Sequence, residues 1–273
     1  MKSKRNVGVT QKLTESAVML ALSVILSYLK LIDLPYGGSI TLCSMLPTIL
    51  IAYRHGVGFG LLTGFANGLL QLLMGMNNLS YATSAMAAVA IIMLDYVLAF
   101  SVTGFGGIFK KVFKSQKAAL SAGVGFVCFL RYLFHVISGC TVWAGLSIPT
   151  NQAFIYSVIY NATYMLPELI IAVAGAFYLG NVIDFSGENL RVAKSPKASG
   201  QSKIFKILGG AGALSAFIAD IVLIAPKLQN AETGEFDITG IFAVNFTAVL
   251  IVTVIGIAWS LLFYILSKKR LTK

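Results

Sequence analysis

The chain has few charged residues and few cysteines, and each shortage excludes a class of protein or of site. Charged residues make up 11% of its 273 positions, while hydrophobic residues make up 57% and the mean hydropathy is +0.83. Soluble domains carry roughly 25% charged residues, so this chain has too little polar surface to stay dissolved. Its three cysteines lack C-x-x-C spacing, which indicates neither a metal site nor a disulfide framework. The sequence therefore predicts an integral membrane protein with no metal and no cofactor.

Motifs for catalysis are also missing. The sequence contains no G-x-x-x-x-G-K-[ST] phosphate loop, so we do not expect the chain to hydrolyse ATP by that route itself. Its apolar segments hold no nucleophile–base pair or metal-ligand cluster, and Glu168 and Asp220 are isolated acids. A net charge of +11 is compatible with nucleic-acid binding, but the basic residues lie in short clusters between apolar runs, which membrane topology explains. We predict a membrane protein that is not an enzyme.

Long apolar stretches predict the number of membrane spans. A helix needs about 20 apolar residues to cross the hydrocarbon core, and eight stretches approach or reach that length. The second stretch is short and the third is rich in glycine, so their limits are the least well defined. We predict an all-α membrane protein whose spans cover residues 14–34, 39–53, 56–74, 82–109, 118–140, 152–180, 204–225 and 238–266.

The basic residues predict how these spans are oriented. Short cytoplasmic loops are enriched in Lys and Arg. If the amino terminus is inside, 18 of the 21 basic residues lie on the cytoplasmic side, and the exceptions are Lys30, Lys227 and Arg131. Eight spans with both termini in the cytoplasm satisfy this pattern.

One polar segment divides the chain. Residues 186–203 are polar and contain Gly187, Pro196 and Gly200, which is typical of a linker. We predict a six-span membrane domain over residues 1–185, a cytoplasmic linker over 186–203 and a two-span extension over 204–273. No sequence repeat relates these parts, so a duplicated secondary-transporter architecture gains no support.

An acid and a phenol, Asp95 and Tyr96, lie near the middle of the predicted span 82–109. A charge at the bilayer centre costs roughly 2.5–3.5 kcal/mol even on insertion scales, so an ionisable residue there indicates a functional site. A cationic ligand, a basic partner in the bundle or a proton would each account for Asp95. Arg131, in the span 118–140, is one candidate partner.

Polar and aromatic residues gather in the next two spans. Arg131 and His135 are four residues apart and share one side of a helix. Gly139 and Trp143 follow at the external end, although a tryptophan at that depth is also typical of an interfacial belt. In the span 152–180, Tyr156, Tyr160 and Tyr164 recur every four residues and Asn161 lies beside them.

Small residues predict two helix contacts. Glycines recur every four residues between 56 and 68, at Gly56, Gly60, Gly64 and Gly68, and we interpret this stripe as intramolecular packing rather than an intermolecular contact. In the first span, Ala17 and Ala21 form a small-x-x-x-small pair.

Taken together, these patterns resemble a known family. The run Leu94-Asp95-Tyr96, the run from Arg131 to His135 followed by Gly139 and Trp143, and the run from Tyr156 to Asn161 are similar to those of the thiamine-binding membrane subunit, or S component, of energy-coupling factor (ECF) transporters. The resemblance covers about residues 10–183. It differs at two places: the family has Glu at the position of Asp95, and a tryptophan in the first external loop, where this chain has Pro35-Tyr36-Gly37-Gly38.

The resemblance implies a function and its partners. The chain would be the substrate-binding subunit of an ATP-driven vitamin importer in the bacterial cytoplasmic membrane, for thiamine or a related pyrimidine or thiazole compound. Its partners would be an ECF transmembrane coupling subunit, docked on Ala17 and Ala21, and two ATPase subunits. The residues that match the family's ligand contacts are Asp95, Tyr96, His135, Trp143, Tyr156 and Asn161.

The chemistry of thiamine agrees with these residue types. Its permanently cationic thiazolium needs a carboxylate, its flat rings need aromatic partners, and its ring nitrogens need amide or phenol groups. The alternative is a proton-coupled secondary transporter of a small cationic or aromatic solute, in which Asp95, Arg131 and His135 form a proton relay.

Overall fold

The structure, a computed structural model, describes residues 8–145, 150–185, 187, 189–192, 200–228 and 238–269. The chain forms two compact units, Met1–Ala193 and Lys194–Lys273, and each is described by itself. Half of the predicted linker 186–203, namely residues 186, 188 and 193–199, lies outside the described residues.

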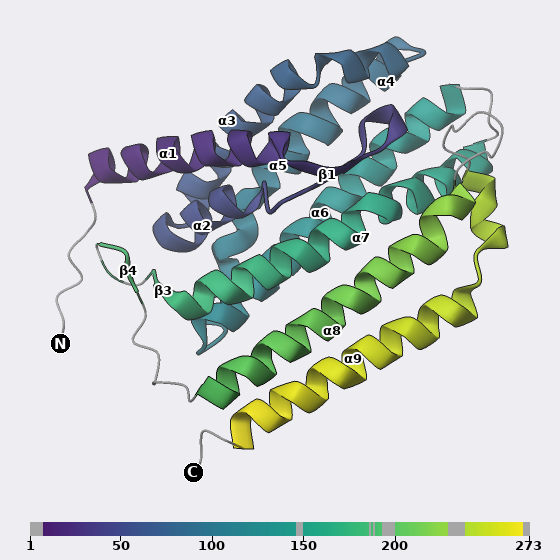
Figure 1. Ribbon diagram of the computed structural model, residues 1–273. Coiled ribbons are helices and arrows are strands. Elements are labelled where there is room, and N and C mark those ends of the chain that lie inside the picture. The colour runs from purple at the N-terminus through teal and green to yellow at the C-terminus, as the bar shows by residue number, and fades with distance from the viewer. Residues whose placement is uncertain are drawn as a thin grey trace. The chain divides into compact units, whose positions relative to one another are not determined.

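The first unit is a helical bundle with two short antiparallel strand pairs (Figure 1). Its third long segment is one interrupted helix, made of α4, a π-helical stretch η3, α5 and a 3₁₀ stretch η4. In chain order its elements are α1 (Val9–Tyr28), β1 (Lys30–Asp33), η1 (Pro35–Gly37), β2 (Ser39–Thr41), α2 (Leu46–His55), α3 (Val57–Met74), η2 (Met76–Tyr81), α4 (Ala85–Ala90), η3 (Ile91–Leu98), α5 (Ala99–Ser101), η4 (Val102–Lys111), α6 (Gln116–Gly145), α7 (Thr150–Val182), β3 (Ile183–Asp184) and β4 (Arg191–Val192).

Seven helices among the described residues are long and apolar enough to cross a membrane, which confirms the prediction of an all-helical membrane protein. The second predicted span, 39–53, is wrong in its limits. Its first residues pair with β1 as the strand β2, and the helix α2 has only 10 residues, or about 15 Å at the rise of an α-helix. The reason is local: Tyr36 and Cys43 both adopt left-handed backbone conformations, which interrupt a helix.

Although it is short, α2 returns the chain to the end of the unit where α1 begins. Arg54, at the end of α2, donates to both carboxylate oxygens of Glu15 at 2.5 and 2.9 Å, and His55 Nε2 lies 2.6 Å from the same carboxylate. We call this the inner end of the unit and the opposite end the outer end. Helix α2 is buried along its length, and its side chains form the main hydrophobic core with α6 and α7.

Glycines allow α3 to pack closely against the interrupted helix. A Cβ on Gly60 would collide with Ala52 and Gly104, and one on Gly64 would collide with the carbonyl oxygen of Phe100. Gly68 meets the backbone of the same helix, so the intramolecular interpretation is confirmed for these three residues. Gly56 instead has open space around it and a φ of +95°, and it forms the turn between α2 and α3.

Basic side chains gather at the inner end. Lys110 donates to the carbonyl oxygen of Tyr53 at 2.9 Å, Lys117 donates to Asn181, and Lys12 lies over the ring of Phe59. Helices α1, α2, α6 and α7 and the stretch η4 thus all place a basic residue or its partner at this end. The orientation rule for basic residues predicts that the inner end faces the cytoplasm.

Cysteine labelling tests this orientation. Ser115, exposed between η4 and α6 at the inner end, and Ser80, exposed in η2 at the outer end, offer a matched pair. We expect a membrane-impermeant maleimide added to intact cells to label Ser80→Cys but not Ser115→Cys, and to label both after lysis. The unsubstituted protein measures the background from the native cysteines. Labelling of Ser115→Cys in intact cells would contradict the predicted topology.

The second unit is an antiparallel pair of helices, α8 (Gly200–Ile224) and α9 (Phe246–Lys269), with short 3₁₀ turns, η5 (Ala225–Leu228) and η6 (Ile238–Ala243), between them (Figure 1). Gly212 packs against the ring of Trp259, whose Nε1 donates to the carbonyl oxygen of Leu208 at 3.0 Å. Thr253 donates to Asp220 at 2.7 Å, so this acid has a partner within the hairpin. We propose that this unit is the two-span extension expected from the sequence.

Candidate functional site

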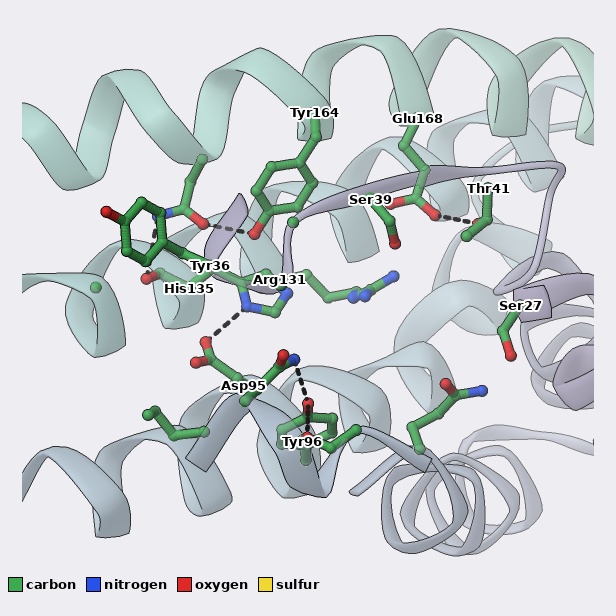
Figure 2. Close-up of a pocket in the computed structure, with 18 of the residues that line it drawn as sticks. Ser27, Tyr36, Ser39, Thr41, Asp95, Tyr96, Arg131, His135, Tyr164 and Glu168 are labelled. Atoms are coloured by element: carbon green, nitrogen blue, oxygen red, sulfur yellow. Dashed lines mark hydrogen bonds and ion pairs between the residues drawn. The ribbon is translucent and has the colours of Figure 1, made fainter. Parts of the chain in front are cut away.

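A cavity of about 300 Å³ opens in the outer half of the first unit. Its walls come from α1, α3, η2, η3, α5, α6, α7 and the segment 30–44 between α1 and α2 (Figure 2). Five of the six residues predicted as ligand contacts line it, namely Asp95, Tyr96, His135, Trp143 and Asn161. The sixth, Tyr156, lies behind Trp143, with 6.1 Å between the two ring centroids, and is not among the lining residues.

Asp95 reaches the cavity from the π-helical stretch η3, and such local widening of a helix is frequent at functional sites. His135 Nδ1 lies 2.7 Å from one of its carboxylate oxygens, and Ser138 donates to the other at 2.7 Å. Figure 2 shows this pair at the centre of the cavity. His135 Nε2 is buried and has no hydrogen-bond partner among the described residues. The carboxylate is thus oriented from two positions on one face of α6.

Arg131 was considered as the basic partner of Asp95, but the fold pairs Asp95 with His135 instead. Arg131 forms no ion pair with Asp95 within the described part of the chain. Its guanidinium carbon lies 4.7 Å from the ring centroid of Phe100, and its Nη1 contacts the sulfur of Met45 at 3.6 Å. A relay joining Asp95, His135 and Arg131 by direct contacts is therefore not present.

Tyr96 serves chiefly to hold the end of α3. Its hydroxyl donates to the carbonyl oxygen of Gly75 at 3.1 Å and accepts from Asn78 at 2.8 Å. Any side chain at Gly75 would collide with the same hydroxyl. Tyr96 therefore borders the cavity but has already used its hydrogen-bonding capacity on the protein.

Aromatic rings close the outer end of the cavity. The ring centroid of Tyr36 lies 4.9 Å from that of Trp143 and 5.2 Å from that of Tyr81, and Tyr160 lies 5.6 Å from Trp143. Tyr36 lies in the loop where the family that this sequence resembles has a tryptophan. A tyrosine therefore supplies the aromatic ring at this place. Tyr160 also accepts from the backbone N–H of Gly38 at 2.9 Å, which fixes this loop against α7.

Asn161 connects the two helices that carry most of the site. Its amide nitrogen donates to the carbonyl oxygens of Ser157 and His135 at 2.8 and 3.2 Å, and its oxygen accepts from Tyr164 at 2.5 Å. Gly139 permits this contact, because a Cβ there would collide with Ser157. The amide therefore sets the spacing of α6 and α7 beside the cavity.

Sequence reasoning missed Glu168, which it treated as an isolated acid. Glu168 is buried, lines the cavity and accepts a hydrogen bond from Thr41 at 2.7 Å. Its spacing carried a signal: Asn161, Tyr164 and Glu168 are separated by three and then four residues and share one face of a helix. The roles of Ser138 and Tyr36 had no comparable pattern in the sequence.

The two alanines predicted for partner docking face outward. Ala17 and Ala21 are exposed on α1, whereas Ser16 and Ser23 on the opposite side of the helix are buried. Ser23 donates to the carbonyl oxygen of Ser44 at 2.6 Å, which attaches α1 to the segment that borders the cavity. The small-residue surface is therefore accessible in the first unit.

Comparisons with known proteins show which family the first unit resembles. A thiamine transporter ThiT from Bacillus subtilis (strain 168) is 37% identical over 171 residues, which are 59% of this chain and 85% of that protein. A thiamine transporter ThiT from Lacticaseibacillus paracasei is 23% identical over 175 residues, 58% of this chain and 81% of the relative. A solved structure of ThiT from Listeria monocytogenes matches with a TM-score of 0.50 and 25% identity, covering 62% of this chain and 92% of that one. The model of the family described as "Thiamine transporter protein (Thia_YuaJ)" matches residues 13–183, so the resemblance expected from the sequence is confirmed and the chain belongs to the thiamine transporter protein family.

Proposed function

We propose that this chain is the substrate-binding membrane subunit of an ECF-type vitamin importer and that it binds thiamine, or a closely related pyrimidine–thiazole compound, in the cavity of the first unit. The observation that carries this proposal is the net negative charge of the cavity, which lies inward of the aromatic rings at its outer end. The cavity has the volume of a small-ligand site, at the lower end of the usual range of roughly 300–1,000 Å³.

The charged groups inside the cavity suit a monocation. Asp95 and Glu168 contribute two negative charges and Arg131 one positive charge, which leaves one net negative charge when His135 is neutral. The other charged lining residue, Lys30, is paired with Asp33 outside the cavity at 2.9 Å. A charge that is removed from water is costly unless it is balanced, and the permanent positive charge of a thiazolium would balance this one.

The positions of the residues suggest a role for each. Asp95, oriented by His135 and Ser138, would balance the thiazolium. Trp143 and Tyr36 at the outer end would stack on the flat pyrimidine, an arrangement that favours aromatic and cationic rings. Asn161 and Tyr156 would act mainly by holding α6, α7 and Trp143 in place, because the amide of Asn161 is already hydrogen-bonded and Tyr156 packs behind Trp143.

Energy for import would come from partner subunits. The sequence has no phosphate loop for ATP, so a transmembrane coupling subunit and two ATPase subunits are the expected partners. The outward-facing Ala17 and Ala21 would let a helix of the coupling subunit approach α1 closely.

Fluorescence of the purified protein tests the ligand assignment. Trp143 and Trp259 are the two tryptophans, so in Trp259→Phe the signal comes from Trp143 alone. We expect thiamine to quench this fluorescence saturably, because its ring would stack on the indole. Trp143→Phe, which retains Trp259, is the matched control and should show no saturable change. If thiamine leaves the emission of Trp259→Phe unchanged and no binding is found by calorimetry, the proposal is wrong.

A further inference from the structure

Arg131 and Glu168 form a second charged layer in the cavity. On α6, Arg131 lies one helical turn closer to the inner end than His135, and on α7, Glu168 lies one turn beyond Tyr164. Both side chains are buried, with exposed fractions of 6% and 4%. In Figure 2, Arg131 lies between the Asp95–His135 pair and Glu168.

Both groups retain hydrogen-bonding capacity that the protein does not use. Glu168 accepts at one carboxylate oxygen, from Thr41, and no bond to the other oxygen is found among the described residues. Arg131 Nε is buried without a partner in the described part of the chain, and the guanidinium otherwise contacts only sulfur and an aromatic ring. Unpaired charged groups are costly in a low-dielectric interior, so this end of the cavity is built to bind a polar group.

We propose that Arg131 and Glu168 form an inner subsite that binds the terminal hydroxyl of the ligand's hydroxyethyl chain and disfavours a phosphate ester at the same position. This inference rests on the proposed function and specifies which form of the ligand the cavity selects. A hydroxyl accepts from the guanidinium and donates to the carboxylate, so one small group satisfies both residues.

The shape of the cavity assigns the hydroxyl, rather than the pyrimidine, to this subsite. Aromatic rings lie at the outer end, where a flat ring can stack. Small hydroxyl side chains, those of Ser27, Ser39, Thr41 and Ser44, line the cavity together with Glu168. The ring of Phe100 also lines the cavity, but the guanidinium of Arg131 lies over it at 4.7 Å. With the thiazolium at Asp95, the hydroxyethyl chain points toward Arg131 and Glu168.

The buried carboxylate provides the selectivity. A phosphate monoester adds about two negative charges at neutral pH, and Arg131 neutralises only one charge while Glu168 repels the ester. The free alcohol carries no charge and meets no such repulsion. Glu168 is therefore a specificity-determining residue, whereas Asp95 governs binding of the cation itself.

The test measures binding of three ligands to the purified protein by calorimetry: thiamine, its phosphate monoester and an analogue in which hydrogen replaces the hydroxyl. We expect the wild-type protein to bind thiamine at least about tenfold more tightly than either of the others, because hydrogen bonds to charged groups contribute roughly 1.5–3 kcal/mol. In Glu168→Gln, which retains the size of the side chain and an oxygen for Thr41, the preference for thiamine over the ester should fall about tenfold or more. Arg131→Gln should weaken the ester most.

Asp184→Asn is the matched control, since it removes the same charge from an exposed site in β3, outside the cavity, and its three affinity ratios should equal those of the wild-type protein. Unchanged affinity ratios in Glu168→Gln would overturn the inner subsite. Equal affinity of the wild-type protein for thiamine and for the analogue without the hydroxyl would also overturn it, and this measurement needs no variant. Either result leaves the proposed function standing if thiamine still binds in an Asp95-dependent manner. Absence of thiamine binding by the wild-type protein would overturn both.

Discussion

Replacing Asp95 with asparagine should lower the affinity for thiamine by about 2–5 kcal/mol, the usual range for truncating one partner of a buried charge pair. The carboxylate holds its position through His135 and Ser138 at 2.7 Å each, and asparagine has nearly the same size. The substitution thus removes the charge and one of the two acceptor oxygens, and calorimetry on the purified protein measures the loss directly.

An uncharged pyrimidine that lacks the thiazolium provides the control. Its affinity should change little in Asp95→Asn, because it has no cation for the carboxylate to balance. Ser138→Ala should have a smaller effect than Asp95→Asn, because the charge remains and only one of its two positioning contacts is lost. If Asp95→Asn weakens both ligands alike and lowers the melting temperature, Asp95 is a structural partner of His135 and the cation site has to be sought at Glu168.

Local patterns were sufficient to predict the membrane class and the helices that carry the site. Hydrophobic length predicted eight spans, and seven of them are helices long enough to cross a membrane in the described part of the chain, because a membrane imposes that length on each segment independently of its neighbours. The family resemblance that includes Asp95, His135, Trp143 and Asn161 identified residues that do line one cavity. These residues lie on long helices, where the position of a residue along the chain also determines its depth in the membrane.

Contacts made by irregular segments were not predictable in the same way. The second span was misplaced because the strand β2 and the left-handed residue Cys43 replace its first turns. Glu168 seemed isolated because its partner, Thr41, is 127 residues away in that segment. A buried acid indicates a site only when its surroundings are known, and these surroundings come from a loop without hydrophobic periodicity.

The largest effect on import is expected on α1. Replacing Ala17 and Ala21 together with tryptophan should abolish ATP-dependent thiamine uptake in cells while leaving thiamine binding by the purified protein within about twofold of the wild-type value, because close approach of two membrane helices requires small residues at the contact. Both alanines are exposed and point away from the buried Ser23 face, so the bulky rings would meet a partner rather than the cavity.

Ala174→Trp provides the matched control, since it makes the same replacement at an exposed alanine of α7, and uptake should survive it. A double α1 variant that binds thiamine, is present in the membrane at wild-type amounts and fails to import would place the coupling contact on α1. Uptake at the wild-type rate by the same variant would exclude this surface as the docking site. Loss of binding together with uptake would instead show that α1 supports the cavity, through Ser23 and its hydrogen bond to the backbone of Ser44, and the docking surface would then have to lie on another helix.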